Sequence, residues 1–267
     1  MKLKLKLFFK SFLLSFVVFA LLSGIIIGSM YMDLNSVEPS AKESTVLMGL
    51  THQDKVICLT VVNMNPEKKS ITFLPMPDNT LLDNNDLLQD LYNSNKTDSI
   101  VNAIERLIGT KINRHIFFSA DAVSTLVNNV GTFKFLIPSP FKYNGSIHGG
   151  TCNMNGELAK AMFTYTDYDK KEFSYSEMGK SFLINFLSEQ VNSKNASKIT
   201  NTLADRSFTS SIITNISASE MNEYINYLCD YSSLSHKFVE LKGTYQTTSK
   251  SKYFMPNEIS SNKNIFK

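Results

Sequence analysis

The side chains best placed for chemistry lie in a short polar loop, Pro75–Thr80, that follows an apolar run of the chain. Prolines interrupt strand hydrogen bonding, so Asp78, Asn79 and Thr80 are expected just beyond the end of a buried strand. Loops in that position commonly carry binding and catalytic groups, because the strand beneath holds them in place. The Asp78 carboxylate has two open interpretations: it belongs to a site, or it caps the turn that follows it.

Other side chains could also do chemistry. His115 and His148 are candidate general bases, because imidazole changes its charge near neutral pH. His115 lies in an alternating apolar stretch, where a structural role is the alternative. The candidate anion-binding cations are lysines, which offer a point charge rather than the fork of an arginine, and most surface lysines only keep a face soluble. They are Lys55, Lys170, Lys171 and Lys180.

The three cysteines, Cys58, Cys152 and Cys229, lie far apart and show no metal-binding spacing. Cys58 falls in an expected strand and Cys229 near the end of an expected helix, so both are expected to be small buried apolar side chains. A Cys152–Cys229 disulfide is an open alternative in an oxidising compartment. The sequence shows no Ser-His-Asp arrangement and no phosphate-cradling glycine loop.

The elements that must position the polar loop are three apolar runs, which we predict to be strands: Val46–Leu50, Val56–Val62 and Ser70–Leu74. Turn-forming residues over Asn63–Lys69 separate the last two. This pattern predicts two antiparallel neighbours beside an earlier strand, in the middle of a sheet. With 267 residues and 43% hydrophobic content, the chain can bury one sizeable core.

Later segments show helix end signals and strand alternation. We predict helices capped by Asp98 and by Ser119, a helix opened by Asn155, and strands over Ile112–Phe118 and Phe133–Ile137. Gly109 is expected to end the first of these helices. Leu81–Asn95 is expected to be a loop with a helical turn, and Phe141–Gly150 a loop.

The N-terminus carries a membrane signal. Lysines within residues 1–10 precede an apolar run, 11–32, with no charge before Asp33. At about 1.5 Å per residue, such a helix crosses a hydrocarbon core of about 30 Å, with the lysines in the cytoplasm. We predict a single-pass signal anchor in the cell membrane, a linker over 33–44 and an extracytoplasmic domain over 45–267. A cleaved signal peptide is the alternative.

The overall charge is mild. The formal net charge is +3 and the sequence pI is near 8.6, and much of the excess lies in the first ten residues. A charge of this size does not argue for a nucleic-acid partner. We therefore expect no nucleic acid among the partners of this chain.

Several stretches resemble the LytR-CpsA-Psr family. The turn and strand in VNMNPEKKSITFLPMPDNT resemble the opening of the family domain. The closest resemblance is in SIVNAIERLIGTKINRHIFFSADAVSTLVNNVGTFKFLIP, with its order of helix, strand, helix and strand. Ile212–Ile216 followed by Ser219–Met221 resembles a later strand-then-helix unit, so the resemblance covers nearly everything after the linker. It implies one α/β domain whose mixed central sheet carries helices on both faces.

The resemblance implies an activity that moves a glycopolymer from a polyprenyl-pyrophosphate carrier onto peptidoglycan. Such chemistry needs cations or clustered donors for the pyrophosphate, a carboxylate-held metal and an apolar groove for the lipid. Asp54 matches the family's acidic residue just before the second strand. The resemblance therefore makes Asp54 a catalytic and Mg²⁺-binding candidate, with an ordinary solvated loop aspartate as the alternative.

The same resemblance places the other candidates. Asp78 stands where the family's Pro-Arg-Asp-Thr loop has its arginine, and an aspartate there repels pyrophosphate unless a metal bridges the two. Thr164 and Thr166 stand at the positions of two active-site arginines, and Lys180 is the one cation in a further segment. The catalytic candidates are Asp54 and Asp78, and the substrate-binding candidates are Lys55, Asn79, Thr80, Thr164, Thr166 and Lys180.

We therefore expect a cell-envelope assembly protein that resembles these transferases, with weak or lost catalysis. The alternative is a non-catalytic binder of a polyprenyl-linked glycan, a wall polymer or a partner envelope enzyme. A transcriptional regulator, an older label for the family, is set aside because an outward-facing domain cannot reach DNA.

Overall fold

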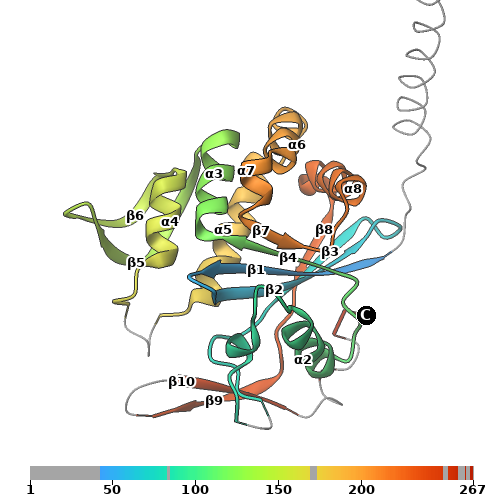
Figure 1. The fold of residues 1–267 in the computed structure, drawn as a ribbon, viewed down its shortest axis with the longest axis vertical. Helices are drawn as coiled ribbons and strands as arrows, with labels where there is room; N and C mark the ends of the chain where they lie inside the picture. The colour runs from blue at the N-terminus through green and yellow to red at the C-terminus, as the bar shows by residue number, and fades with distance from the viewer. Residues whose placement is uncertain are drawn as a thin grey trace, which may run out of the picture. The chain divides into compact units, whose positions relative to one another are not determined.

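The centre of the fold is a mixed sheet of six strands: β1 (Ser44–His52), β2 (Lys55–Asn65), β3 (Ser70–Pro75), β4 (Arg114–Ser119), β7 (Ile212–Thr214) and β8 (Ser235–Phe238). In this computed structural model the spatial order is β7-β4-β1-β2-β3-β8 (Figure 1). The pairs β1–β2, β2–β3 and β4–β7 are antiparallel, and β1–β4 and β3–β8 are parallel. The three predicted opening strands are confirmed, and β2 runs on to Asn65, which shortens the predicted turn.

The structure describes residues 43–82, 85–168, 173–248, 252–257, 262 and 265–266. The predicted membrane helix over 11–32, the basic segment before it and nearly all of the predicted linker lie outside these ranges. Lys170 and Lys171 also lie outside them. Within the described ranges, no helix combines the length and the hydropathy needed to cross a bilayer.

Both faces of the sheet are covered, which explains why its central strands are apolar throughout rather than alternating. Successive side chains of a strand point to opposite faces. Val46 and Leu50 of β1 enter one core together with Val62 of β2. Leu47 and Val61 enter a second core on the other face. The predicted α/β class with a mixed central sheet is thus confirmed.

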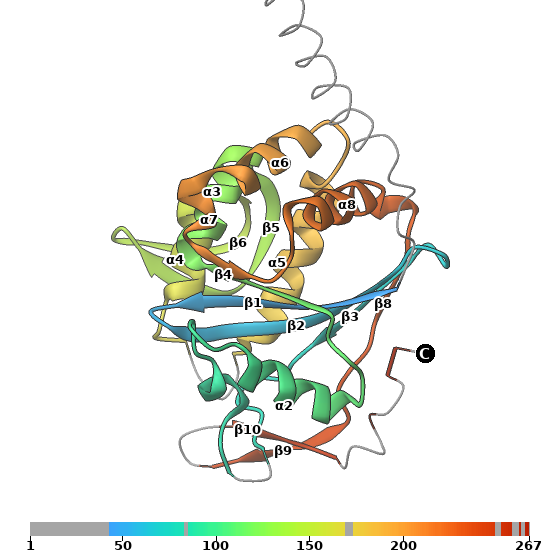
Figure 2. The ribbon, with the colours of Figure 1, turned by 45° about the vertical axis from the view of Figure 1, so that its right-hand side comes forward.

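The first face carries most of the helices: α3 (Ala120–Val130), α4 (Gly156–Thr164), α5 (Tyr175–Gln190), α6 (Ala196–Ala204), α7 (Arg206–Thr209) and α8 (Ala218–Cys229). The second face carries α2 (Asp98–Ile108), the 3-10 turn η1 (Leu88–Leu91) and the hairpin of β9 (Gly243–Thr247) and β10 (Lys252–Pro256) (Figure 2). A further 3-10 turn, η2 (Tyr231–Ser233), precedes β8.

Most helix ends follow from local chemistry. The Ser119 hydroxyl accepts a hydrogen bond from the Ala122 backbone N–H and caps α3, as predicted. Asn155 caps α4 in the same way. Gly109 ends α2 with a φ of 63°, a left-handed conformation that glycine adopts without strain. Asp98 is the first residue of α2 rather than its cap, which corrects the predicted boundary by one position.

The predicted loop over Phe141–Gly150 is wrong. The chain there forms a hairpin of β5 (Phe133–Tyr143) and β6 (Ser146–Met154), seen at the left of Figure 1. The register shifts between Ile137 and Phe141, so the prolines of β5 lie at an irregularity where ladder hydrogen bonds are already missing. Asn144 and Gly145 both have positive φ, of 48° and 78°, as a two-residue hairpin turn requires.

The three cysteines are free, so the Cys152–Cys229 disulfide does not form. Cys58 lies in β2, where burial and, second, the charge of Asp78 raise the pKa of its thiol to about 12. At that pKa the thiol stays protonated at neutral pH and is a poor nucleophile.

Gly49 is a position where the sheet has no room for a side chain. A Cβ at Gly49 would overlap the ring of Phe117, its partner on β4, and would lie 3.2 Å from Leu59 Cδ2. We predict that Gly49→Ala lowers the free energy of unfolding by about 1–3 kcal/mol, as overpacking does in other cores. Urea unfolding of the full chain in detergent, followed by far-UV circular dichroism, measures this.

Gly149→Ala is the matched control. Gly149 lies in β6 with an exposed side, and a Cβ there would lie 3.2 Å from Pro140 Cγ without meeting a buried ring. Its cost should be well below that of Gly49→Ala. Equal unfolding midpoints for the two variants would contradict the steric account of Gly49.

Candidate functional site

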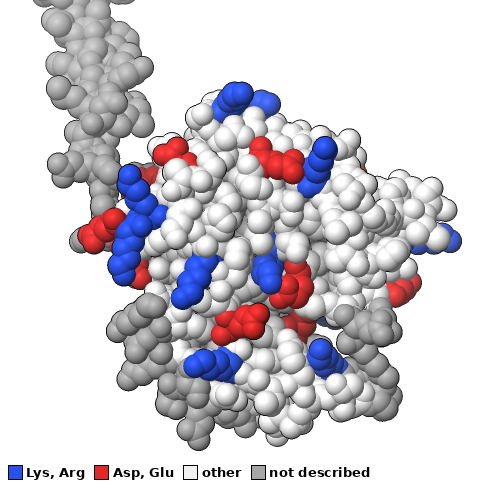
Figure 3. Space-filling model, turned by 180° about the vertical axis from the view of Figure 1, so that it is seen from behind, with Lys and Arg blue, Asp and Glu red and all other residues white. Residues whose placement is uncertain are grey.

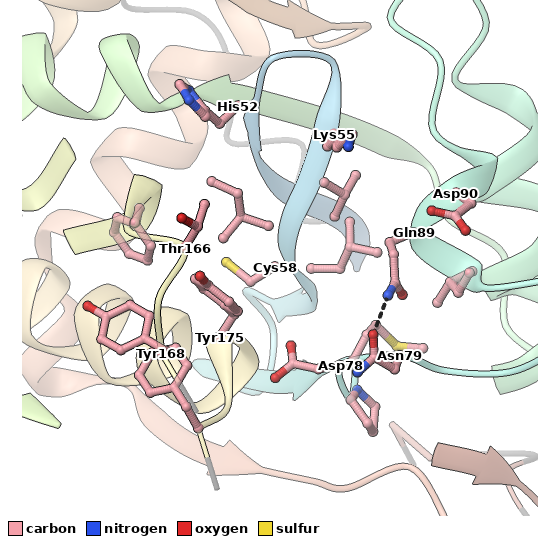
Figure 4. Close-up of a pocket in the computed structure, with 18 of the residues that line it drawn as sticks. His52, Lys55, Cys58, Asp78, Asn79, Gln89, Asp90, Thr166, Tyr168 and Tyr175 are labelled. Carbon is pink, nitrogen blue, oxygen red and sulfur yellow. Dashed lines mark hydrogen bonds between the residues drawn. The ribbon is translucent and has the colours of Figure 1, made fainter. Parts of the chain in front are cut away.

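A polar cavity of about 570 Å³ opens where several chain segments meet at one end of the central strands (Figure 4). The tip of the β1–β2 hairpin and the first half of β2 form one wall. The loop after β3 and η1 form a second, and the segment from the end of α4 to the start of α5 forms the third. The polar residues among its lining are His52, Gln53, Lys55, Asp78, Asn79, Gln89, Asp90, Thr164, Thr166, Tyr168 and Tyr175.

The cavity brings together most of the residues that the sequence singled out. Lys55, Asp78, Asn79, Thr164 and Thr166 all line it, although they come from three separate segments. The polar loop therefore lies where it was predicted, at the end of a buried strand and at the wall of a cavity. What each of these residues binds stays a prediction.

The remaining candidates lie elsewhere. Asp54 is exposed at the tip of the β1–β2 hairpin, with a φ of 57°, and is not part of the cavity wall. Thr80 is fully buried, and its hydroxyl donates to the Pro77 carbonyl at 2.6 Å, which closes the loop. Lys180 pairs with Glu177 at 2.6 Å, outside the wall.

Asp78 is held by a helix far away in the sequence. Its Oδ1 accepts a hydrogen bond of 2.9 Å from the backbone N–H of Ser176, in the first turn of α5. The Ser174 hydroxyl caps the same turn by accepting from the Glu177 N–H. Asp78 therefore does act as a cap, as predicted. It caps the first turn of α5, however, and not the turn that directly follows it in the sequence.

The second carboxylate oxygen of Asp78 has no partner. Oδ2 is buried and accepts no hydrogen bond within the described part of the chain. Burial raises the pKa of the Asp78 carboxyl from its ordinary value of 3.8 to about 6, and the nearby Glu177 adds to the rise. Hydrogen bonds from Ser174, Ser176 and Tyr175 act in the opposite direction. Strongly perturbed carboxyls of this kind are enriched in functional sites.

Asn79 links three elements at the cavity rim. Its side-chain nitrogen donates to the Lys252 carbonyl of β10 at 3.0 Å, and its oxygen accepts from Gln89 Nε2 of η1 at 3.0 Å, the dashed line in Figure 4. Asn79 has a φ of 51°, which asparagine tolerates better than most residues. These bonds fix the loop that carries Asp78.

An aromatic wall completes the cavity, and the sequence reading did not identify it. Phe163, Tyr168, Phe173 and Tyr175 line it. The rings of Tyr168 and Phe173 stack with centroids 3.8 Å apart, and Tyr175 Oη donates to the Tyr165 carbonyl at 2.5 Å. The density of aromatic residues between 163 and 175 was the available signal. Figure 4 shows Asp78 between these tyrosines and the Asn79–Gln89 pair.

A second, apolar cavity of about 220 Å³ lies beneath the polar one, between the sheet and helices α3, α5, α6 and α8. Its lining is almost wholly aliphatic and aromatic, with Leu126, Leu183 and Leu228 among the contributors. Cys58 and Phe163 line both cavities, so the two spaces adjoin there. The arrangement offers a polar space for a head group next to an apolar space for a chain.

The candidate histidines take no part in this wall. His115 Nε2 lies 3.2 Å from the Thr97 hydroxyl, and burial lowers its pKa, which fits the structural alternative. His148 packs against Phe141 in the β5–β6 hairpin, with ring centroids 5.8 Å apart. The histidine that does line the cavity is His52, which the sequence reading passed over.

The charges on the cavity wall are few and mixed. Within the described ranges, which exclude Lys170 and Lys171, Lys55 is the one lysine or arginine that lines the cavity, and Asp78 and Asp90 are the carboxylates. The chain has three arginines, Arg106, Arg114 and Arg206, and none of them lines the cavity. On the face seen in Figure 3, basic and acidic side chains are likewise interspersed.

The described residues contain no group of three or more His, Cys, Asp or Glu side chains arranged to hold a metal ion. Protein donors alone therefore do not fit a resident metal at Asp54. A magnesium ion commonly keeps several waters and binds one or two carboxylates together with substrate phosphates. The predicted Mg²⁺ at Asp54 stays a prediction that depends on oxygen ligands from a substrate.

Comparison with known proteins connects this architecture to a family. The model described as "LytR_cpsA_psr family" matches residues 42–266. No curated protein matches the chain. Among solved structures, TagV of B. subtilis superposes with a TM-score of 0.67 at 18% identity, covering 84% of this chain and 93% of that one.

Two further structures are similar. TagT, solved as "TagT bound to LI-WTA", has a TM-score of 0.61 at 16% identity and covers 83% of this chain and 87% of its own. A putative transcription regulator from Eubacterium siraeum has a TM-score of 0.62 at 17% identity, covering 82% and 88%. At these identities the likeness concerns the fold.

Asp78 should make stability depend on pH. Because its folded pKa of about 6 exceeds the ordinary 3.8, the folded state binds the proton more tightly than the unfolded state. The stabilisation is complete below about pH 4 and is lost as the pH rises through about 6, by up to about 3 kcal/mol. We predict that Asp78→Asn removes this loss, measured by urea unfolding between about pH 4 and about pH 7.

Glu67→Gln, at an exposed position between β2 and β3, is the control and should keep the wild-type pH profile. Asparagine at 78 retains an oxygen that can accept from Ser176, so the helix cap survives the substitution. Identical pH profiles for the wild type and Asp78→Asn would show that the Asp78 carboxyl titrates normally.

Proposed function

The chain belongs to the LytR_cpsA_psr family, and on that premise we propose that it is a cell-envelope assembly protein. We infer that it binds the lipid chain of a lipid-linked glycan and that its transferase activity is weak or lost. The alternative within the same proposal is a purely non-catalytic binder of a wall polymer or of a partner envelope enzyme.

The observation that carries the proposal is the junction of the two cavities. A lipid-linked glycan has an apolar chain and a polar head, and the molecule offers adjoining apolar and polar spaces that meet at Cys58 and Phe163. Pockets lined by apolar groups with a few placed polar groups are the usual form of such sites. The similar protein TagT was solved bound to LI-WTA and to LIIa-WTA, which supports a ligand of this class.

The proposal of weak catalysis rests on the charges at the wall. Transfer from a pyrophosphate needs positive charge or preorganised donors at the developing negative charge. Of the residues that the structure describes, Lys55 is the one lysine or arginine that lines the polar cavity, and Asp78 and Asp90 oppose it. The Thr164 hydroxyl already donates to the Lys160 carbonyl, and the Thr166 hydroxyl to Asp167 Oδ1. Neither threonine replaces the charge of an arginine.

We also propose the membrane location that the N-terminal sequence suggests. A helix over 11–32 would anchor the chain, with residues 1–10 in the cytoplasm and the domain over 45–267 outside. This places the cavities on the side of the membrane where wall polymers are assembled, with peptidoglycan as a neighbouring partner. Protease added to intact spheroplasts should digest the domain, and a protected domain would contradict this orientation.

The apolar cavity should govern lipid affinity. Leu183 on α5 lines it, and Leu183→Trp would fill part of its volume of about 220 Å³. We predict a loss of about tenfold or more in affinity for a radiolabelled polyprenyl lipid, bound to the full chain in detergent micelles. Ser188→Trp, at an exposed position of the same helix, is the control and should bind normally. Unchanged binding by Leu183→Trp would exclude this cavity as the lipid site.

Catalysis can be tested directly with a labelled polyprenyl-pyrophosphate-linked glycan and peptidoglycan, with and without Mg²⁺. We expect turnover near background, because Lys55 alone among the described wall residues offers positive charge to the leaving pyrophosphate. Robust transfer that Asp54→Ala abolishes would overturn the proposal of weak catalysis. It would also establish Asp54 as a catalytic residue.

A further inference from the structure

The N-terminus of α5 faces the polar cavity and is already occupied by a negative charge from the chain itself. Backbone N–H groups at a helix start attract anions. Here the Ser176 N–H donates to Asp78 Oδ1, and the Ser174 hydroxyl caps the same turn. An incoming phosphate would have to displace this carboxylate or lie against it.

Among the described residues, the charged groups around Asp78 compensate its charge little. On α5, Glu177 raises the pKa of Asp78, and Lys180 forms an ion pair with Glu177. Across the cavity, η1 contributes Asp90, and Lys55 on β2 is the one opposing cation among the described residues of the wall. The negative charge of Asp78 is felt by its surroundings, because it raises the pKa of Cys58, Tyr175 and Tyr245.

The Oδ2 atom of Asp78 lacks a hydrogen-bond donor within the described part of the chain. Oδ2 is buried without a hydrogen-bond partner among the described residues, and such a group is costly unless something donates to it. A hydroxyl group donates, whereas a pyrophosphate offers only acceptors and negative charge. Gln89 and Thr166, on two different walls of the cavity, are neutral polar groups, and the rings of Tyr168 and Tyr175 lie on the side of Thr166. This is a wall suited to a hydroxylated, uncharged head group.

We propose that Asp78 determines the specificity of the polar cavity, selecting a lipid whose head presents hydroxyl groups and rejecting one whose head is a pyrophosphate. The proposal rests on the lipid-binding function proposed above and narrows it. A prenol or a glycosylated lipid without pyrophosphate would fit. The ligand would then differ from the pyrophosphate-linked carrier that the family resemblance implies.

A matched pair of ligands tests this, because geranylgeraniol and geranylgeranyl pyrophosphate share one chain and differ only in the head. Each competes with a radiolabelled polyprenyl lipid for the full chain in detergent micelles containing EDTA. We expect the wild type to prefer the alcohol by about tenfold or more. Asp78→Asn should reduce that preference by about tenfold, since it removes the negative charge and replaces one acceptor oxygen with an amide donor that suits a pyrophosphate oxygen. Asp121→Asn, outside the cavity, should keep the wild-type ratio.

Other outcomes overturn the inference. The specificity proposed for Asp78 is refuted if the wild type prefers the pyrophosphate, or if Asp78→Asn leaves the ratio of the two affinities unchanged. In both cases the proposed lipid binding stands. If Mg²⁺ restores pyrophosphate binding and Asp78→Asn abolishes that effect, Asp78 is a metal ligand rather than an excluding charge. Binding of neither ligand refutes the proposed lipid function, and the specificity of Asp78 with it.

Discussion

Burial of the central strands on both faces is the constraint on which the rest of the molecule depends. β2 pairs with β1 on one side and β3 on the other, and its side chains enter both apolar cores. The helices on either face bury apolar side chains against this sheet, and on the first face also against one another and the β5–β6 hairpin. Cys58, on the same strand, lines both cavities. β2 therefore contributes to both cores and also lines the boundary between the polar cavity, proposed for a lipid head group, and the apolar cavity, proposed for its chain.

Asp78 lowers the stability of the folded state at neutral pH, and it does so next to a candidate site. A buried carboxyl with a raised pKa opposes folding at neutral pH, and an asparagine would fill the same space without that cost. Local rules of stability are commonly broken where a protein binds or reacts. The carboxylate is also kept in place from outside its loop, by the first turn of α5 and, through Asn79, by η1 and β10.

The fold of this chain is retained despite wide divergence in sequence. The chain keeps the architecture of structures to which it is 16% to 18% identical, because apolar periodicity and helix caps tolerate many substitutions. Charged side chains at a binding or catalytic site tolerate few substitutions. Among the described residues, the wall of the polar cavity carries Lys55 against Asp78 and Asp90, and the shared fold does not by itself establish which reaction occurs there.

The sequence by itself determined the central strands, several helix ends and the polar loop at the end of β3, because periodicity, capping and proline act over a few residues. Only the tertiary structure decided that Asp78 meets Ser176, 98 residues away, and that residues between 163 and 175 form an aromatic wall. The tertiary structure also decided that β5 continues beyond its prolines, which lie where the pairing with β6 is irregular. These features depend on how distant segments pack, and no local pattern in the chain encodes that.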